Sequence, residues 1–320
     1  MTDLTSKPEI SVIIPTYNRA RLLPRSLQSV LSQTCDRYEV IVADDGSSDD
    51  TNDVLAHWQG LFGERMRTLR LNHAGVACAR NSGLAASRGR WVAFLHSDDE
   101  WLPNHLETAL AAFHQAAAPG LVLTDHYIQS DRLIRTRVDL GDQEVEAVRR
   151  IILRKAVLLT TVVMIDRRVY EQLGGFDAAL QGTEDWEYWA RIAIDYPVVH
   201  VPEVTAIIHQ HSENHSSNPE KAEIQLAAAA RVINQRKISK YCSEAQVTAR
   251  ALLDSAEFYS WNGWTRKTLL QLFRAGNLDP GLLLTRDALR IFARGMLPLP
   301  VYRKVRDVVW RKLRRLQIRI

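Results

Sequence analysis

Two adjacent carboxylates stand just beyond an apolar run, and their position indicates a metal site. The run spans residues 91–95, Asp98 and Asp99 follow it, and Pro103 ends the segment. Hard divalent cations prefer oxygen ligands, and phosphate-handling enzymes usually hold Mg²⁺ or Mn²⁺ with one or two carboxylates. Asp98 and Asp99 are therefore candidate ligands. The alternative is a solvated acidic turn before a helix that begins near Asn104, because Asp and Asn are favoured at helix caps.

A second acidic pair, Glu184 and Asp185, opens a later helical pattern. Thr183 precedes the pair as a candidate cap, and acids in the first turn of a helix complement its dipole. Capping alone would explain both carboxylates. However, Trp186 and Trp189 are large apolar neighbours that could desolvate a carboxylate and raise its basicity, as a general base requires.

Three histidines, His209, His211 and His215, follow the apolar runs at residues 198–201 and 205–208. Imidazole binds ions of the Mn²⁺ type and pairs with phosphate when it is protonated. A single histidine is more often structural. Three of them just past a strand favour a site.

The order of the apolar runs predicts the fold that positions these residues. Runs at 10–14, 40–43, 67–71 and 91–95 alternate with helical patterns. This alternation predicts an α/β fold with a Rossmann-like, mostly parallel sheet and helices on both faces. Such sheets bind ligands beyond the carboxyl ends of their strands. Three of those ends carry distinctive polar residues: Tyr17 and Asn18, Asp44 and Asp45, and Asp98 and Asp99.

Two common nucleotide-binding motifs are missing from the sequence. No Gly-x-Gly-x-x-Gly follows the first run, and no Gly-x-x-x-x-Gly-Lys-Ser/Thr occurs anywhere. Dinucleotide-binding and P-loop interpretations therefore lose their main support. We expect a nucleotide held through a bridging metal instead.

Composition indicates an ordinary soluble globular protein. The 320 residues are 46% hydrophobic and 24% charged, which is enough for one large domain and a smaller one. The three cysteines lack metal-ligand spacing, and neither a leader segment nor an apolar run long enough to span a bilayer occurs. We therefore expect a cytoplasmic protein with reduced thiols.

The net charge of +4 is unevenly distributed along the chain. From Arg286 onward, eleven Lys and Arg stand against two Asp, so this part carries +9 and the preceding residues −5. Residues 301–320 place valines and leucines on one helical face, which predicts an amphipathic helix on an anionic membrane surface. The alternative is that Val305, Val309 and Leu313 pack on the helical hairpin expected at residues 245–261 and 266–275. Nucleic-acid binding is not expected, because aromatic residues are few in this tail.

Taken together, the motifs resemble those of the inverting glycosyltransferases of family 2, which have the glycosyltransferase A fold. The matching features cover roughly residues 8 to 216, and the chain beyond Asn218 is not part of the match. They are residues 12–19, 42–49 and 75–84, Gly89, the pair Asp98 and Asp99, and residues 174–177 and 184–187.

The resemblance implies a donor site. Pro15, Tyr17 and Asp45 would line the nucleoside pocket, with Asp45 accepting a hydrogen bond from the base. Arg80 would lie near the diphosphate.

The resemblance also implies a metal and a base. Asp98 would be the main ligand of Mn²⁺ or Mg²⁺, with Asp99 beside it, and His211 would approach the metal or the diphosphate. Asp185 would be the catalytic base. One position departs from the family pattern, because His96 stands where the first Asp of Asp-x-Asp-Asp is usual.

The implied reaction moves a sugar, with inversion, from a nucleotide-sugar donor, expected to be UDP-linked, to a hydroxyl of a saccharide or lipid-linked saccharide. Bacterial-type cell-surface polysaccharide or glycolipid synthesis would be its setting. Residues 1–216 would form the transferase domain, with a nucleotide-binding half (1–103) and an acceptor half (104–216), and residues 217–320 a C-terminal α-helical region with the basic tail. Two alternatives are a non-catalytic nucleotide-sugar sensor and a sugar nucleotidyltransferase, although residues 15–21 lack the glycine-rich loop that the latter needs.

Overall fold

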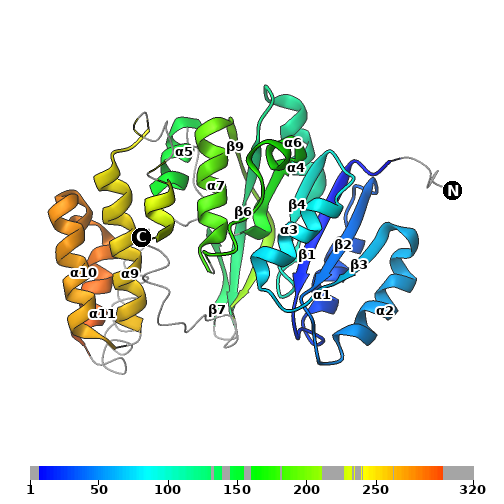
Figure 1. Cartoon of the computed structure of the whole chain (residues 1–320), viewed down its shortest axis with the longest axis horizontal. Helices are drawn as coiled ribbons and strands as arrows, with labels where there is room; N and C mark the ends of the chain where they lie inside the picture. Colours follow the sequence, from blue (N-terminus) through cyan, green and yellow to red (C-terminus); the bar gives the residue numbers. More distant parts are fainter. Residues whose placement is uncertain are drawn as a thin grey trace. The chain divides into compact units, whose positions relative to one another are not determined.

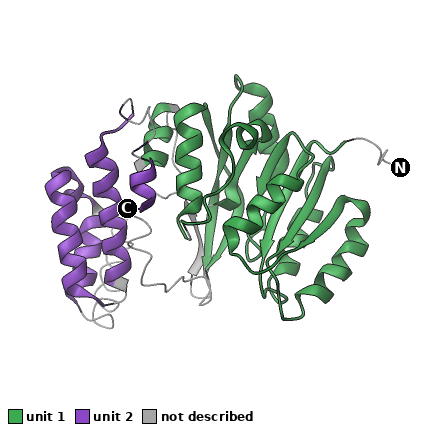
Figure 2. Ribbon diagram, in the orientation of Figure 1, with its two compact units in different colours: residues 1–217 green, residues 218–320 purple. Residues whose placement is uncertain are grey.

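The computed structural model describes residues 7–130, 133–138, 145–154, 160–180, 182–210, 227–232, 241–261 and 263–297, with residues 234 and 239. The chain separates into two compact units, unit 1 (Met1–Ser217) and unit 2 (Asn218–Ile320), which Figure 2 colours separately. Within these described ranges, none of the helices combines the length and the apolar character needed to cross a membrane.

Unit 1 is built on one mixed sheet of nine strands (Figure 1). The strands follow the order β3-β2-β1-β4-β8-β6-β9-β5, and β7 pairs with β6. The first half of unit 1 supplies the parallel strands of the sheet and the helices that connect them. In chain order the elements are β1 (Ile10–Thr16), α1 (Leu23–Leu31), β2 (Tyr38–Asp44), α2 (Thr51–Phe62), η1 (Gly63–Arg65), β3 (Met66–Arg70), α3 (Val76–Ala86) and β4 (Trp91–Phe94).

The second half of unit 1 extends the sheet beyond β4, and β8 joins β4 in antiparallel orientation. β6 then pairs with β8 antiparallel and with β9 parallel. The elements are β5 (Glu100–Trp101), α4 (His105–Gln115), β6 (Leu121–Ser130), β7 (Leu133–Val138), α5 (Val145–Arg154), η2 (Thr160–Val162), β8 (Val163–Asp166), α6 (Arg167–Leu173), α7 (Glu184–Asp195) and β9 (Val198–Gln210).

Helices cover both faces of this sheet, because alternate residues of a strand point to opposite sides. Val12 and Ile14 of β1 belong to a core formed with α1, α2 and α4. Ile13, between them, belongs to a second core formed with α3, α5, α6 and α7. The central strands β1, β2 and β4 are therefore buried along their whole length.

The carboxyl ends of β1, β2 and β4 lie at the same edge of the sheet, where β1 and β2 end together and β4 ends three residues earlier along β1. Thr16 pairs with Asp44 across β1 and β2, and Ile13 pairs with Phe94 across β1 and β4. The three polar segments that follow these strands therefore meet at one edge of the sheet, as the sequence predicted.

Unit 2 contains helices around a small apolar core. They are α9 (Glu244–Trp261), α10 (Thr265–Leu278), η5 (Pro280–Leu284) and α11 (Arg286–Met296). Gly263, at φ +71°, turns the chain between α9 and α10. Leu253 of α9, Leu272 of α10 and Ile291 of α11 meet in the core.

Three expectations about the elements need correction. The runs at 198–201 and 205–208 belong to one strand, β9, whose pairing with β6 shifts register around Asp125. Strand β7 and helix α11 were not predicted. Thr183 precedes α7, but its side chain makes no capping hydrogen bond.

Candidate active site

The loops after β1 and β2 are tied together by side-chain hydrogen bonds. The Asn18 amide oxygen accepts from the backbone N–H of Ser48 (2.8 Å), and the Asn18 N–H donates to the Ser47 hydroxyl (2.8 Å). The Ser47 hydroxyl in turn donates to Asp44 (2.5 Å). These bonds give the rim of the site a fixed shape before any ligand binds.

A stacked aromatic pair forms one end of the site. The rings of Tyr17 and His73 lie 4.2 Å apart at 26° to each other. His73 Nδ1 is 3.1 Å from a carboxylate oxygen of Asp45. Asp45 also accepts hydrogen bonds from the N–H groups of Ala74 (2.9 Å) and Gly75 (2.8 Å), which fixes the turn into α3. This end offers ring faces and hydrogen-bond acceptors, a combination suited to a flat heterocycle.

These side chains line a cavity of about 360 Å³ at the sheet edge. Its walls come from all three strand ends and from α3, so one ligand can contact all of them. The lining residues are Pro15, Thr16, Tyr17, Arg19, Asp45, His73, Gly75, Val76, Ala79, Arg80, His96, Ser97 and Asp98. The cavity therefore brings together Pro15, Tyr17, Asp45, Arg80 and Asp98, the residues predicted for the donor site.

Asp98 and Asp99 have different surroundings. The Asp98 side chain is 16% exposed, and its carboxylate lies 3.9 Å from Arg19 Nη2. Asp99 is buried, and its two carboxylate oxygens accept hydrogen bonds from the Thr161 hydroxyl (2.6 Å) and the His209 N–H (3.0 Å). Asp98 is therefore the carboxylate presented to a ligand, whereas Asp99 connects the loop after β4 to η2 and β9.

A buried ion pair lies next to the cavity and includes Arg80, one of its lining residues. Arg80 of α3 donates to Glu184 of α7 at 2.6 Å, and both side chains are about 4% exposed. Arg80 also lies 3.0 Å from His96 Nε2. Because a guanidinium only donates, His96 Nε2 must accept, which leaves its proton on Nδ1 facing Asp99 at 3.5 Å.

Asp185 lies beside this ion pair at the start of α7. Its carboxylate accepts from the N–H of Trp186 (2.7 Å) and from the Thr160 hydroxyl (3.3 Å). Burial, and then the neighbouring Glu184 carboxylate, raise the pKa of Asp185 above its usual range, while the charge of Arg80 and the hydrogen bond from the Trp186 N–H oppose the rise. A carboxylate with a raised pKa is suited to accept a proton.

Three of these groups could hold a divalent cation. One ligand atom each from His96, Asp98 and Asp99 lies within 4.8 Å of the others. Mg²⁺ binds its ligands at about 2.0–2.1 Å, so ligand atoms on opposite sides of the ion are about 4 Å apart. The carboxylates of this cluster are therefore close enough to share a divalent cation, with Asp98 open to the cavity and His96 Nε2 already engaged with Arg80.

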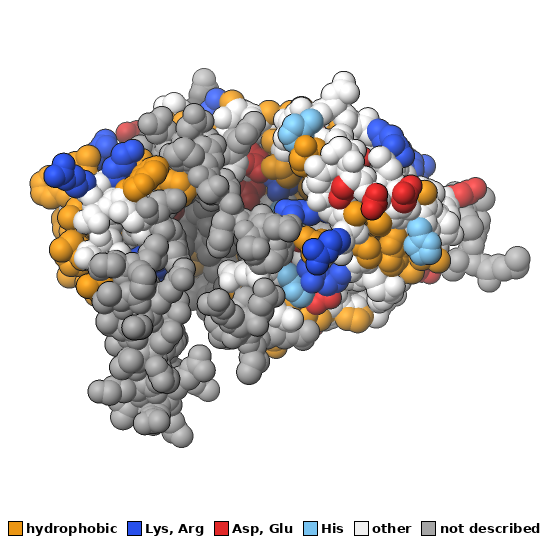
Figure 3. All heavy atoms as spheres, turned by 90° about the horizontal axis from the view of Figure 1, so that it is seen from below, with side chains coloured by type: hydrophobic (Ala, Val, Ile, Leu, Met, Phe, Trp, Pro, Cys, Tyr) orange, Lys and Arg blue, Asp and Glu red, His pale blue; other side chains and the backbone are white. Residues whose placement is uncertain are grey.

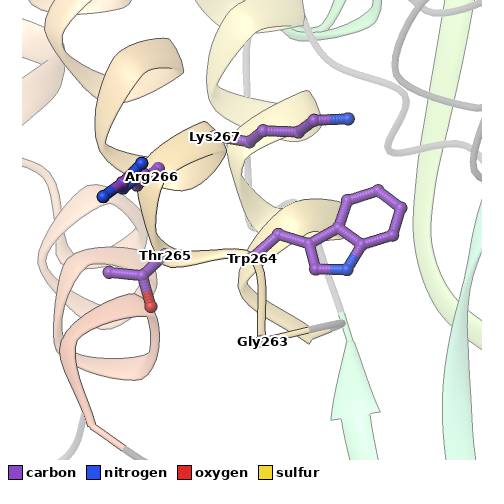
Figure 4. Close-up of a pocket in the computed structure, with 5 residues that line it drawn as sticks. All are labelled: Gly263, Trp264, Thr265, Arg266 and Lys267. Carbon is purple, nitrogen blue, oxygen red and sulfur yellow. The ribbon is translucent and has the colours of Figure 1, made fainter.

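A second cavity lies in unit 2, at the start of α10. It measures about 380 Å³ and is lined by Gly263, Trp264, Thr265, Arg266 and Lys267 (Figure 4). This lining contains no acid, histidine or cysteine. This cavity therefore offers neither a base nor a metal ligand among the residues that line it.

Two contributors to the site were missed from the sequence, and one predicted residue cannot be placed. His73 carried no signal, because it follows a weak strand without a motif around it. Thr161 lies 62 residues from Asp99, its partner, and only the fold brings them together. His211 lies outside the described residues, whereas His209 lies in β9 and contacts Glu100 (3.1 Å).

Comparison with known proteins identifies the class to which this fold and site belong. Residues 11–174 match the model of glycosyl transferase family 2. The chain therefore belongs to that family, as its motifs predicted.

Two bacterial relatives illustrate the likeness at the sequence level. Over 114 residues the chain is 38% identical to an uncharacterized glycosyltransferase of Nostoc sp., covering 36% of this chain and 35% of the relative. Over 105 residues it is 41% identical to a Bacillus subtilis protein provisionally named a teichuronic acid biosynthesis glycosyltransferase, covering 32% and 41%. The matched region is thus less than half of either relative.

Solved structures show the likeness at the level of the fold. S. aureus TarS 1–349 in complex with UDP-GlcNAc superposes with a TM-score of 0.65 at 19% identity, over 84% of this chain and 80% of that one. The mannosyltransferase PcManGT from Pyrobaculum calidifontis, in complex with GDP-Man and Mn²⁺, gives 0.60 at 19% identity, over 91% and 85%. The predicted glycosyltransferase A fold is confirmed.

Proposed function

We propose that this chain transfers a sugar, with inversion, from a nucleotide-sugar donor to an acceptor hydroxyl, with the help of a divalent cation. One observation carries the proposal: the Asp98 carboxylate lines the same cavity as Tyr17 and Asp45. A metal-binding group and a heterocycle-binding end within one cavity suit a nucleoside diphosphate.

In this proposal the nucleobase binds at the end formed by Pro15, Tyr17, His73 and Asp45. The Tyr17 ring is 42% exposed and offers a face for stacking. Asp45 would accept a hydrogen bond from the base while it keeps the turn into α3 in place. The donor is proposed to be UDP-linked, and the UDP-GlcNAc complex of the structural neighbour supports that choice.

Asp98 would hold Mn²⁺ or Mg²⁺, with Asp99 fixing the loop behind it. A bound cation would supply charge neutralisation for the departing diphosphate. Arg80 lies at the same end of the cavity and would add positive charge near the leaving group. Its pairing with Glu184 and His96 holds the guanidinium in one orientation.

Asp185 would take the proton from the acceptor hydroxyl. Its raised pKa makes it a stronger base than an ordinary aspartate, and a positioned base of this kind contributes about 10²- to 10⁴-fold in rate. A base on one side of the sugar and a leaving group on the other give inversion at the anomeric carbon. The acceptor is proposed to be a saccharide or a lipid-linked saccharide.

The setting proposed for the reaction is the synthesis of a cell-surface polysaccharide or glycolipid on the cytoplasmic side. The provisional name of the Bacillus subtilis relative supports a polysaccharide product. The basic tail at residues 301–320, which lies outside the described residues, would add a peripheral membrane contact.

Incubation with a panel of nucleotide sugars, with and without Mn²⁺, tests the proposal. Slow release of nucleoside diphosphate that requires Mn²⁺ and is lost in Asp98→Ala supports a transferase. Binding of the nucleotide sugar without any turnover, with or without acceptors, would instead favour the sensor. His96, which stands in place of the usual Asp, makes that second outcome worth testing.

A further inference from the structure

Unit 2 exposes a large apolar surface. Twelve large hydrophobic side chains are exposed in the described part of the chain, and nine of them fall between Trp264 and Met296. Large exposed apolar patches on soluble proteins usually mark interaction sites. Figure 3 shows hydrophobic side chains gathered over α10 and α11, with Lys and Arg side chains beside them. The nine are Trp264, Leu270, Phe273, Leu278, Leu283, Leu284, Leu289, Phe292 and Met296.

On α10, apolar and cationic side chains share the exposed face. Arg266, Leu270, Phe273 and Arg274 follow one another at i, i+4, i+7 and i+8, which places them on the same side of a helix. All four are exposed, and the opposite side, with Leu272, is buried. Helix α10 carries three Lys and Arg and no acid. This mixture is typical of a helix that lies on a lipid surface.

Helix α11 adds a second apolar row beside the first. Leu289, Phe292 and Met296 are exposed at i, i+3 and i+7, whereas Ile291 is buried in the core of unit 2. The two helices touch closely, because a Cβ added to Gly295 would come within 2.7 Å of the Thr268 side chain. The exposed rows therefore lie on neighbouring helices.

Charge decides which partner fits this surface. Residues 265–297 contain six Lys and Arg against two Asp, a net +4, and residues 298–320 add a further +7. Within the first group Arg294 is buried and Arg290 pairs with Glu257 and Asp287, so the exposed cations that remain for a partner, among the described side chains of this face, are those of α10: Arg266, Lys267 and Arg274. A two-fold contact with a second copy would place the same basic surface against itself. An anionic lipid surface instead attracts each cation near it. Leu, Phe and Met side chains can enter the boundary between headgroups and acyl chains.

We propose that the exposed face of α10, η5 and α11 docks on a membrane surface bearing anionic lipids. Leu270, Phe273, Leu284 and Phe292 enter the headgroup region, and the guanidinium groups of Arg266 and Arg274 bind lipid phosphates. Figure 4 shows Arg266 pointing away from Lys267, whose ammonium lies over the Trp264 ring (4.6 Å). The proposal does not depend on the assigned reaction, since docking needs no donor.

Flotation of the full chain with phosphatidylglycerol vesicles, in the absence of nucleotide sugar, tests the proposal. The triple variant Phe273→Ser/Leu284→Ser/Phe292→Ser removes three exposed apolar side chains, so its vesicle affinity should fall at least about tenfold. Arg266→Ala/Arg274→Ala should weaken binding to phosphatidylglycerol vesicles at low salt. Leu61→Ser is the control, because Leu61 is about as exposed as Phe292 (51% against 49%) but lies on α2 of unit 1, and it should bind like the parent.

Several results would overturn the proposal. One is a parent protein that binds no vesicles, and another is a triple variant that binds them as tightly as the parent. A parent that self-associates without vesicles, and a triple variant that does not, would assign the surface to a second copy. A marked fall in the melting temperature of the triple variant would show that other parts of the chain cover it.

Discussion

At the scale of single residues, the two neighbouring aspartates after β4 have different roles. Asp98 faces the cavity, whereas Asp99 is buried with a hydrogen-bond donor on each carboxylate oxygen. The two residues lie in a turn closed by the hydrogen bond from the Asp99 N–H to the His96 carbonyl (3.2 Å), and this turn directs Asp98 to the cavity and Asp99 into the fold. Substitutions should therefore have different consequences at the two positions.

For Asp98→Ala we expect loss of Mn²⁺-dependent affinity for nucleoside diphosphate with little change in stability. The substitution removes a partly exposed ligand and leaves no cavity in the core. Calorimetric titration with UDP, with and without Mn²⁺, measures the effect. Asp53→Ala, an exposed acid at the start of α2, is the control and should behave like the parent. Undiminished Mn²⁺-dependent affinity in Asp98→Ala would remove Asp98 from the metal site.

For Asp99→Ala we expect a loss of stability. The substitution leaves the Thr161 hydroxyl and the His209 N–H without their acceptor, and an unsatisfied buried polar group costs about 1–3 kcal/mol. Urea unfolding measures the change in the free energy of unfolding. A variant as stable as the parent would show that water or another group satisfies these donors.

Asp185→Asn should abolish transfer, keep donor binding and raise stability at neutral pH. Because the folded-state pKa of Asp185 is raised, the folded protein favours the protonated form, and this contribution is lost as pH rises through that pKa. The ionised carboxylate therefore costs stability at pH 7, and an amide removes the cost. In the parent enzyme, turnover should fall as acidification protonates the base.

Melting temperatures at pH 7 and pH 4 check the stability part of this expectation. The gain from Asp185→Asn should shrink at pH 4, where the parent carboxyl is more protonated. Asp195→Asn, at the other end of α7, is the control and should change neither turnover nor stability strongly. Transfer at the parent rate in Asp185→Asn would leave Asp185 as a helix-start carboxylate only.

At the scale of elements, hydrophobic periodicity predicted much of unit 1. The alternating runs placed β1, β2, β3 and β4 within two residues of their bounds, and the helical patterns between them correspond to α1, α2 and α3. These elements are buried on both faces or amphipathic, so the sequence pattern carries the signal. Because the strand ends follow from this order, the cavity residues Tyr17, Asp45 and Asp98 could be grouped before the structure was known.

Elements without a clean period were harder to predict. Pro202 and Glu203 interrupt the apolar pattern of β9, which therefore looked like two strands. Helix α11, by contrast, is strongly amphipathic, so its period was present in the sequence, although this segment was interpreted only through its charge. The pairing of Arg80 with Glu184 spans 104 residues, and nothing local in the sequence encodes it.

The Arg80–Glu184 ion pair joins α3 to α7. We expect Glu184→Ala to lower the free energy of unfolding by about 3–5 kcal/mol, because it leaves a buried guanidinium unpaired. Chemical denaturation provides the measurement. Arg80→Met/Glu184→Leu should recover much of the stability, since an apolar pair can replace a buried ion pair, but it should not recover activity. Glu171→Ala, which breaks an exposed pair on α6, is the control and should cost less than about 1 kcal/mol. Equal losses of unfolding free energy in Glu184→Ala and Glu171→Ala would contradict a stabilising role for the Arg80–Glu184 pair.

At the scale of the whole molecule, charge is separated along the chain. Residues 265–320 carry +11, so the first 264 residues carry −7. An acidic catalytic unit and a basic C-terminal segment have opposite preferences for an anionic surface. The part of the chain that binds such a surface can thus be tested apart from the part that binds the donor.

Deletion of residues 301–320 is the test at this scale. It removes a net +7, so we expect binding to phosphatidylglycerol vesicles to weaken at least about tenfold, with an unchanged melting temperature and unchanged hydrolysis of the donor. Raising the salt concentration should weaken binding of the full chain more than that of the truncated one, because ions screen charge over about 8–10 Å at ordinary ionic strength. A lower melting temperature with unaltered vesicle binding would instead mean that Val305, Val309 and Leu313 belong to the core.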